Sequence, residues 1–535
     1  MASSTEPSSG RATTWSWLGD PLFHLSLRNV GLLVLLLPLA VAIPGLLATF
    51  IYLRVPGHRV YRSVYFFPAV LSPVIVGAIF NLMLGYEGPL NSALAAIGAG
   101  PVDWLGDPGI AMFTVVGVHI WATFGMALVV FLAGFSTLDA SLLDAARVDG
   151  ASLRRTIWHV IIPSLTRTIQ FVFVTTMIGM LTSMFGLLFV MTSGGPGGVH
   201  LPAGVLHLAP AGTDEPVDAR LGRLDGSLRR HARGGAPADH PAPSRREAGL
   251  MPRTRPARWV AAVPMAALAL ATIYPLVFTA NVAMKTRREY VLDRFSPAGS
   301  PRWDNLAEAW VGAGMAGYFV NSFIVVACAV ALLLLLGSMA GFALARLRFR
   351  GSSMIFLGCL AGLFVPFQVI MVPLTRVMAD SGLVDTYPGL ILAYVAQFLP
   401  FTVFLMTSHY RTIPAEIVDA ARIDGNTVYG VYLRIMLPLG APALLSVGIL
   451  DALFCWNDVL IALLMMPSPE NRTLMIGVNA LRGQYSGDIP VFASGVLIAA
   501  VPVLMIYLFL QRQITDGITA QLHERLTCGS LAIAP

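Results

Sequence analysis

Long apolar runs separated by polar segments fill most of the chain after residue 30. The first four runs cover residues 30–53, 65–84, 110–135 and 169–191. Six more cover residues 260–283, 318–345, 354–378, 390–407, 441–466 and 491–510. A helix that crosses a bilayer needs about 20 predominantly apolar residues. The pattern therefore predicts an all-α fold, a polytopic transmembrane helical bundle of about four spans followed by six.

The charges in the loops predict which side of the membrane each loop faces. Arginines crowd the loop after the first run, whereas residues 85–109 hold three acidic residues and no Lys or Arg. Because cytoplasmic loops carry an excess of Lys and Arg, the first loop should be cytoplasmic and residues 85–109 external. The fourth run then ends outside, yet arginines within residues 253–258 place the start of the fifth run inside. The two halves therefore predict conflicting topologies.

One short charged segment occurs twice, with the copies 275 positions apart. In each copy an Asp is expected near a helix start, where the helix dipole favours a carboxylate. The two alanines after it should leave a thin surface that a partner can approach, a glycine permits a turn, and a proline marks entry to the next span. The predicted docking residues are Asp144, Ala145, Ala146, Gly150 and Pro163 in the first copy and Asp419, Ala420, Ala421, Gly425 and Pro438 in the second.

Composition agrees with a membrane protein and disfavours other classes. The chain is 56% hydrophobic and 12% charged, with a mean hydropathy of +0.72, whereas about a quarter of the residues of soluble chains are charged. The net charge of +6 fits cytoplasmic loops better than a nucleic-acid surface. The single lysine, Lys285, follows no glycine-rich loop, so the chain lacks a Walker-type phosphate loop. The four cysteines have no metal-ligand spacing, and the chain is predicted to be neither a metalloprotein nor an enzyme.

The repeated segment resembles the Glu-Ala-Ala-x3-Gly-x9-Ile-x-Leu-Pro signature of permease subunits of bacterial ATP-binding cassette (ABC) importers, with Asp for Glu in both copies. In that family the segment forms the coupling helix, which seats in a cleft of the ATPase subunit. Other motifs resemble the carbohydrate branch, of maltose and multiple-sugar type. Tyr61-Arg-Ser-Val-Tyr-Phe-Phe-Pro68 resembles its F-type subunit, and Trp456-Asn-Asp458 resembles its G-type subunit.

The resemblance implies two tandem permease units in one chain. Residues 1–29 are a polar N-terminus, 30–198 an F-type unit that lacks its first and last spans, 251–519 a complete G-type unit, and 520–535 an atypical tail. Residues 199–250 contain no aromatic residue, Ile or Lys. They are expected to be a disordered linker or an out-of-frame stretch that joins two reading frames.

The resemblance also implies the function: the membrane component of a sugar importer in the bacterial inner membrane. The expected partners are two ABC ATPase subunits, an extracellular solute-binding protein, the sugar and membrane lipid, with no nucleic acid. No cofactor is expected in this chain, because ATP and Mg would bind to the ATPase subunits. Aromatic and polar side chains after each repeated segment are candidates for sugar contacts, with helix packing as their alternative role. They are Ser183, Phe185, Trp456 and Asn457.

Two alternatives stay open on sequence grounds. A frameshifted fusion that never assembles would account for the missing spans, and resequencing the coding DNA for residues 191–259 would test it. A secondary transporter would also carry internal repeats. It would need an intramembrane ionisable pair, for which Asp451 and Asp458 are candidates without an evident basic partner. The sequence does not name the sugar.

Overall fold

The computed structural model describes residues 21–192 and 255–508, apart from positions 54, 137, 139, 183, 348, 364 and 486. Every regular element in these ranges is a helix. The chain before residue 21, the expected linker 199–250 and the expected tail 520–535 lie outside the described residues.

The helices of the first half follow one another as α2 (Pro21–Tyr52), α3 (His58–Phe66), η2 (Phe67–Val70), α4 (Pro73–Leu84), α5 (Pro89–Ala96), α6 (Ala111–Ser136), α7 (Ala140–Val148), α8 (Leu153–Thr156), η3 (Ile157–Ile161), α9 (Ile162–Ser164), α10 (Thr166–Thr182) and α11 (Met184–Thr192). Those of the second half are α12 (Arg255–Ala283), α13 (Arg287–Leu292), α14 (Asp304–Ala307), η6 (Glu308–Gly312), α15 (Met315–Arg346), α16 (Ser352–Leu363), α17 (Phe367–Asp380), α18 (Tyr387–Thr412), α19 (Ala415–Ile423), α20 (Val428–Val431), η7 (Tyr432–Met436), α21 (Leu437–Asn457), α22 (Leu460–Met465), η8 (Pro469–Asn471) and α23 (Leu474–Gln484). A last helix covers Ile489–Leu508.

Within the described ranges, eight helices are long and apolar enough to cross a membrane, or up to ten if each of two bent pairs is one span. This confirms the predicted polytopic helical bundle. The predicted run 354–378 is not one straight helix, because α16 and α17 meet at 103°. Pro366 directly precedes α17 with an extended backbone. Proline lacks an N–H group and disfavours helical geometry in the residue before it, which explains the break.

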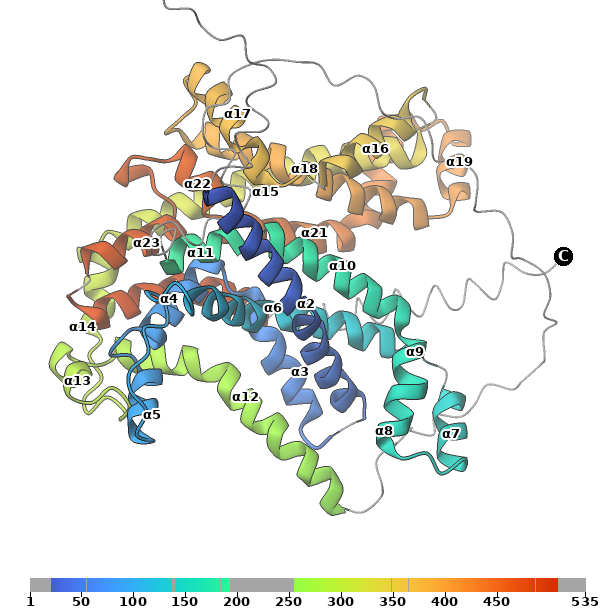
Figure 1. Cartoon of the computed structure of the whole chain (residues 1–535). Coiled ribbons are helices and arrows are strands. Elements are labelled where there is room, and N and C mark those ends of the chain that lie inside the picture. The colour runs from blue at the N-terminus through green and yellow to red at the C-terminus, as the bar shows by residue number, and fades with distance from the viewer. Residues whose placement is uncertain are drawn as a thin grey trace, which may run out of the picture.

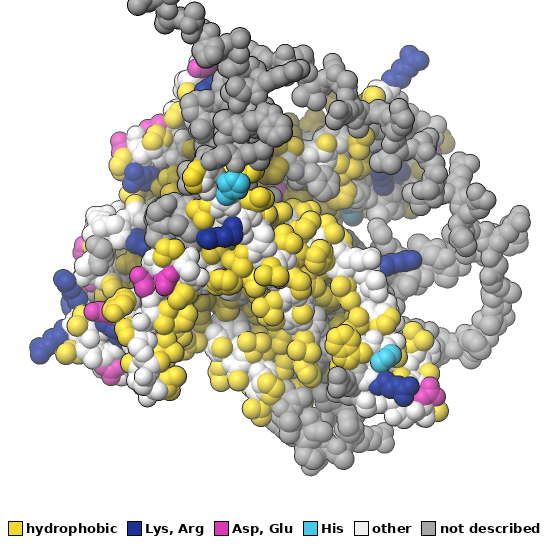
Figure 2. All heavy atoms as spheres, in the orientation of Figure 1, with side chains coloured by type: hydrophobic (Ala, Val, Ile, Leu, Met, Phe, Trp, Pro, Cys, Tyr) yellow, Lys and Arg dark blue, Asp and Glu magenta, His cyan; other side chains and the backbone are white. Residues whose placement is uncertain are grey.

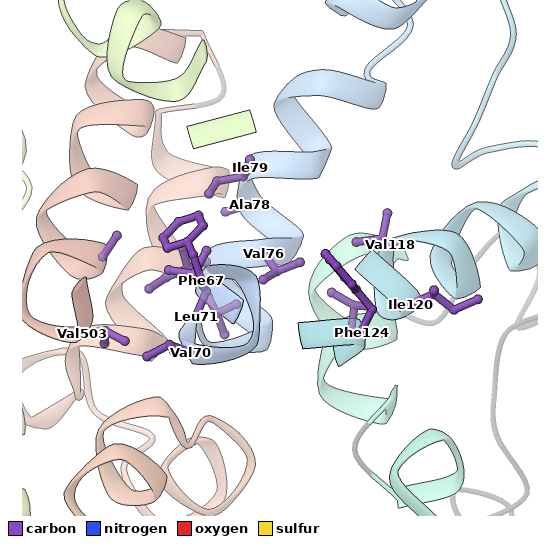
Figure 3. Close-up of a cluster of buried hydrophobic side chains, with 14 of the residues drawn as sticks. Phe67, Val70, Leu71, Val76, Ala78, Ile79, Val118, Ile120, Phe124 and Val503 are labelled. Carbon is purple, nitrogen blue, oxygen red and sulfur yellow. The ribbon is translucent and has the colours of Figure 1, made fainter. Parts of the chain in front are cut away.

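The two halves pack into one bundle (Figure 1). α4 packs against α11 of its own half and against α23 of the other, and α12 packs against α3. The buried side chains of the first half form one cluster with those of α23 and the last helix. Figure 3 shows Val503 of the last helix beside Val70 of η2. The interface between the halves is therefore a continuous apolar core.

The two ends of the bundle carry different elements. α5, α13 and α14 lie at one end, and α7, α8 and α19 lie at the other (Figure 1). At the first end, Arg294 Nη2 lies 2.7 Å from Glu87 Oε2 and joins the loops of both halves. This end includes the loop 85–109 that is predicted to be external. Both repeated segments lie at the opposite end, which the loop charges predict to be cytoplasmic.

Buried polar contacts hold the loop that follows α12. Lys285 is 1% exposed, and its Nζ donates to the carbonyl oxygen of Asp293 at 2.6 Å. Asn305 Nδ2 donates to the carbonyl oxygens of Ala283 and Lys285 at 2.8 Å each. A buried amine or amide is tolerated only when its hydrogen bonds are made. These contacts therefore fix α13 and α14 against the end of α12.

Two glycines let α15 and α18 approach closely. Gly337 and Gly341 lie one turn apart on α15, and both are buried. A Cβ added at Gly337 would lie 2.5 Å from Thr402 Cγ2, and one added at Gly341 would lie 2.8 Å from Met406 Cβ. Small residues permit this close packing between membrane helices. The glycine pair therefore sets the distance between α15 and α18.

Among the described residues, the first half stops at one end of the bundle and the second half starts at the other end. Near the end of α11, the carbonyl oxygen of Val190 accepts hydrogen bonds from Asn81 Nδ2 at 3.3 Å and Arg482 Nη1 at 2.6 Å. Those donors lie toward the end that carries α5. The first turns of α12 lie instead beside α3, where the Tyr65 hydroxyl donates to the carbonyl oxygen of Met265 at 2.6 Å. The structure thus retains the topological conflict that the loop charges predict.

Candidate functional site: the repeated segments

The two copies of the repeated segment fold alike, element by element. α7 and α19 are nine-residue helices. Each is followed by a four-residue helix (α8, α20), a π-helical turn (η3, η7) and the start of the next helix (α9, α21). Every boundary in the second copy, up to the start of α21, lies 275 positions after its counterpart. π-helical turns are rare and occur frequently at functional sites, so the shared pair marks this segment as more than a connecting loop.

The predicted position of the Asp in each repeated segment is wrong. Asp419 is the fifth residue of α19, not its start, and the acidic residue of the first turn is Glu416. Asp144 has the same place in α7, which has no acidic residue in its first turn. The helix dipole acts within the first turn, so it does not explain these carboxylates. The Asp419 side chain is exposed, whereas the Asp144 side chain lies outside the described part.

The two alanines of each copy have different roles. Ala146 and Ala421 are 7% and 5% exposed and pack inward, whereas Ala145 and Ala420 are exposed. The expectation of a thin surface therefore holds for the first alanine of each pair and is wrong for the second. Helical periodicity places adjacent residues about 100° apart, so one member of a pair faces the bundle when the other faces solvent.

The glycines and prolines behave as predicted. Gly150 has φ 65° and Gly425 has φ 82°, and a Cβ at either would have nothing within 4 Å. Glycine is needed there for the left-handed backbone, which L side chains rarely adopt. Pro163 and Pro438 are the second residues of α9 and α21, directly after the π-helical turns. Because the helix is continuous there, each proline leaves one carbonyl of the preceding turn without its helical partner.

Exposed apolar side chains recur at matching positions, a feature that the sequence reasoning missed. Val148 and its counterpart Ile423 are 89% and 87% exposed at the ends of α7 and α19. Leu142 and its counterpart Ile417 are also exposed, one and a half turns earlier. Large apolar residues exposed in the same register of both copies are typical of a surface that another molecule covers. A signal was present in the sequence, since all four positions are aliphatic, and Val148 and Ile423 each lie between an Arg and an Asp.

The second copy is held by hydrogen bonds that the side chains of the first copy cannot make. A buried chain of hydroxyls joins α18, α15 and η7: Tyr410 Oη lies 2.8 Å from Ser338 Oγ, which accepts from Tyr432 Oη at 3.0 Å. The first-copy counterparts of the two tyrosines are Phe135 and Ile157, which have no hydroxyl. The α19 loop is therefore tied to three elements through polar contacts, whereas these positions of the α7 loop pack through apolar ones.

Arg346 adds a further tie at the same place. Its Nη2 donates to the carbonyl oxygen of Tyr410 at 2.6 Å and to that of Ile413. The last carbonyls of a helix have no partner within the helix, so this guanidinium links the ends of α15 and α18 directly before α19.

The predicted sugar-contact residues lie where the halves meet, as far as they are described. Asn457 Nδ2 donates to the carbonyl oxygen of Val70, in the other half, at 3.2 Å. Trp456 is 8% exposed, and its ring packs edge-on against Phe319 with centroids 5.6 Å apart. Asn457 Oδ1 and Trp456 Nε1 are buried without a partner among the described residues. Ser183 and the side chain of Phe185 lie outside the described part.

The family of binding-protein-dependent transport system inner membrane components matches residues 38–207 and 334–518. These two ranges make up more than half of the chain, and each includes one repeated segment. The chain belongs to this family. This permease is thus a multi-pass protein of the inner membrane and the membrane component of an ABC transport system, not itself an enzyme. Its family implies ATPase subunits and a solute-binding protein as partners.

Individual relatives each match about half of this permease. It is 33% identical over 251 residues (47% of this chain, 83% of the relative) to the probable ABC transporter permease protein YurM of Bacillus subtilis. It is 34% identical over 249 residues (46% and 82%) to the diacetylchitobiose uptake system permease protein NgcG of Streptomyces coelicolor. Among solved structures, a bacterial ABC transporter involved in the import of alginate matches 49% of this chain and 98% of its own chain, at 19% identity and a TM-score of 0.45. Two family matches in one chain fit two tandem units.

Proposed function

We propose that this permease imports a sugar or short oligosaccharide, and that two separate ATPase subunits drive it through the repeated segments. The observation that carries the proposal is the matching fold of the two repeated segments, residues 144–163 and 419–438, at one end of the bundle (Figure 1). We call these segments the first and the second docking loop. The sugar class is supported by relatives named for diacetylchitobiose, for arabinooligosaccharides and for melibiose, raffinose and stachyose. ATP and Mg would be held by the ATPase subunits.

In each docking loop, one face of a short helix meets the ATPase. Ala420 and Asp419 are exposed on α19, and the 87% exposed Ile423 stands at its end. A small residue beside an exposed aliphatic side chain and a carboxylate offers close approach, apolar burial and charge together. Gly425 turns the chain back toward η7, and Pro438 begins the span. Ala145, Gly150 and Pro163 would serve the same purposes in the first loop.

A displacement of the second docking loop would move several spans together. Tyr432 of η7 reaches Ser338 of α15, and Ser338 reaches Tyr410 of α18. A displacement of α19 by the ATPase would therefore shift α15 and α18 together with α21, which follows η7 directly. Because Asn457 at the end of α21 contacts Val70 of the other half, the displacement would end at the interface where we place the sugar path. Trp456 would offer a ring face for stacking on a sugar.

The test compares two glycines that share a backbone conformation but lie at opposite ends. Gly425 has φ 82° and Gly98, after α5, has φ 80°, and a Cβ added at either would meet nothing within 4 Å. A β-branched residue in the left-handed backbone conformation destabilises that conformation by about 1–2 kcal/mol. A change of about 1.4 kcal/mol corresponds to roughly a tenfold change in an equilibrium constant. The complex with the ATPase subunits would be purified and its ATPase activity and oligosaccharide uptake measured.

Gly425→Val should lower ATPase co-purification and sugar-stimulated ATPase activity about tenfold, while Gly98→Val should leave both near the wild-type level. Equal loss in both variants, or none in either, would contradict docking through α19. If Gly425→Val uncouples the ATPase but no oligosaccharide in a panel stimulates the wild-type complex, docking stands and the sugar class is wrong. Transport that continues after deletion of the ATPase gene would instead support a secondary transporter.

A further inference from the structure

The first copy departs from the second where the docking loop joins the membrane span. In the second copy, Val428–Asn457 is one continuous helical span. In the first copy, Ile157–Ser164 and Thr166–Thr182 are bent by 66°. The break falls at Leu165, whose φ and ψ are −94° and 9°. In Figure 1, α8 and α9 accordingly turn away from α10 and run across the end of the bundle.

This bent segment carries a cluster that the second copy does not have. A shallow cavity of about 350 Å³ is lined by Ser152, Arg155, Trp158 and His159. Arg155 and His159 are exposed, and Trp158 is 61% exposed. Figure 2 shows basic, histidine and acidic side chains together at the end that carries α7 and α8. The second-copy counterparts are Thr427, Gly430, Leu433 and Arg434, with one cation and no aromatic ring. The cluster therefore lies within the first repeated segment, between Gly150 and Pro163, but its residue types are not shared by the second copy.

The backbone fixes the arrangement of these side chains. The backbone N–H of Arg155 donates to Ser152 Oγ at 3.4 Å, and His159 Nδ1 lies 3.2 Å from the carbonyl oxygen of Arg155, one turn back. Arg155 and His159 are four positions apart on the helix, so their side chains share a face. The Arg155 guanidinium thus presents hydrogen-bond donors beside the exposed indole, and the His159 imidazole, whose Nδ1 faces the Arg155 carbonyl oxygen, donates to an anion through Nε2 in its imidazolium form.

The surface next to the cluster suits a lipid better than a soluble ligand. Beyond the bend, Phe171, Val174 and Ile178 are exposed along one face of α10, a spacing of three and four that gives an apolar stripe. A helix that crosses the bilayer presents such a stripe to acyl chains. Tryptophan favours the boundary between membrane and water, and basic groups on the cytoplasmic side attract anionic lipids.

We infer that this cluster binds the headgroup of an anionic phospholipid. The phosphate would lie between Arg155 and His159, with Ser152 as a further donor, Trp158 at the depth of the glycerol backbone, and the acyl chains along the stripe on α10. The bound lipid would hold the first docking loop at the membrane surface. Phe135 and Ile157 cannot form the hydroxyl chain of the second copy, so a bound lipid would add a polar contact at the first docking loop.

Native mass spectrometry of the purified full chain tests the inference. The protein would be titrated in detergent with phosphatidylglycerol or with phosphatidylcholine of the same acyl chains. The attraction of one basic residue near a membrane surface corresponds to about fivefold in binding. We therefore expect a preference for phosphatidylglycerol on the order of tenfold in the wild type, its loss in Arg155→Gln/His159→Gln, and its retention in Arg434→Gln, the second-copy control.

Any one of five outcomes would overturn the inference. The double variant could keep the wild-type preference, or Arg434→Gln could lose it equally, which would indicate general charge only. Inorganic phosphate at millimolar concentration could displace the lipid, which would indicate a soluble-anion site. In a second preparation, purified with the ATPase subunits, the double variant could keep the lipid and lose the ATPase subunit, which would assign the cluster to docking. If Arg155→Gln/His159→Gln fails to elute as a single species, Arg155→Lys/His159→Lys replaces it, and loss of the preference in this cationic variant would contradict the proposal.

Discussion

The packing of α15 against α18 predicts that Gly341→Ala destabilises the protein, although alanine is the better helix former. A Cβ at Gly341 would lie 2.8 Å from Met406 Cβ, 3.0 Å from the backbone nitrogen of Thr407 and 3.1 Å from the backbone carbon of Met406. A side chain could rotate away, but the backbone atoms of α18 move only if the whole helix moves. To restore ordinary contacts, the two helices would have to separate by roughly 0.5–1 Å.

The magnitude follows from two opposing effects. Inserting a methyl group into a well-packed core costs about 1–3 kcal/mol. Replacing glycine by alanine inside a helix returns up to about 1 kcal/mol. The net change at Gly341 should therefore be a loss of about 1–2 kcal/mol. Gly358 in α16 provides the matched control, because it is also helical but a Cβ there would meet nothing within 4 Å. Gly358→Ala should be neutral or stabilising by up to about 1 kcal/mol.

The assay is thermal denaturation of the full chain in detergent, followed by the fraction that remains monodisperse on size-exclusion chromatography. The expected order of midpoints is Gly358→Ala at or above the wild type, and Gly341→Ala several degrees below it. If Gly341→Ala were as stable as Gly358→Ala, the close approach of α15 and α18 would be refuted.

Further predictions concern two sets of polar contacts: the hydroxyl chain around Ser338, and the turn that holds Asp385. Ser338→Ala removes the shared partner of two buried tyrosine hydroxyls and should lower the free energy of unfolding by about 1–3 kcal/mol. The control is Ser446→Ala, because Ser446 is exposed and bonds to Pro442 of its own helix; it should lower the free energy of unfolding by about 0.5 kcal/mol or less. The thermal midpoints of both variants check this. Hydrogen bonds from Ser468, and then from Asn471, lower the pKa of Asp385 from its ordinary value of 3.8. The Asp385 carboxylate therefore stabilises the fold above that pH and loses this contribution as the pH falls through its lowered pKa. Between about pH 6 and about pH 3 the wild type should lose more thermal stability than Asp385→Asn, and equal losses would contradict the assignment.

Much of the docking site was predictable because its information is local. The register of 275 positions is a property of the sequence, and the same residues at the same spacing fold into the same helices, π turns and glycine turns. The place of Asp419 was misread although local signals were present. No side-chain cap marks the start of α19, but Pro414 precedes its first residue and Glu416 lies in its first turn. Both are signals of a helix start, and they place that start four residues before Asp419.

The contacts between the halves were beyond sequence reasoning for a different reason. Hydropathy places residues in spans but does not say which spans touch. The bond from Asn457 to Val70 joins positions 387 residues apart, and neither residue type indicates the other. The break before α17 was also missed, because an average over an apolar run gives little weight to one proline.

The burial of Lys285 has a practical consequence for labelling. The chain contains no other lysine, and this one is 1% exposed with its amine bonded to Asp293. Amine-directed cross-linkers and dyes therefore find no accessible lysine side chain on this protein. A single lysine introduced at an exposed position, such as Asp424 within the second docking loop, would become the one accessible lysine side chain, and lysine cross-links formed in a mixture with the ATPase subunits would report that position.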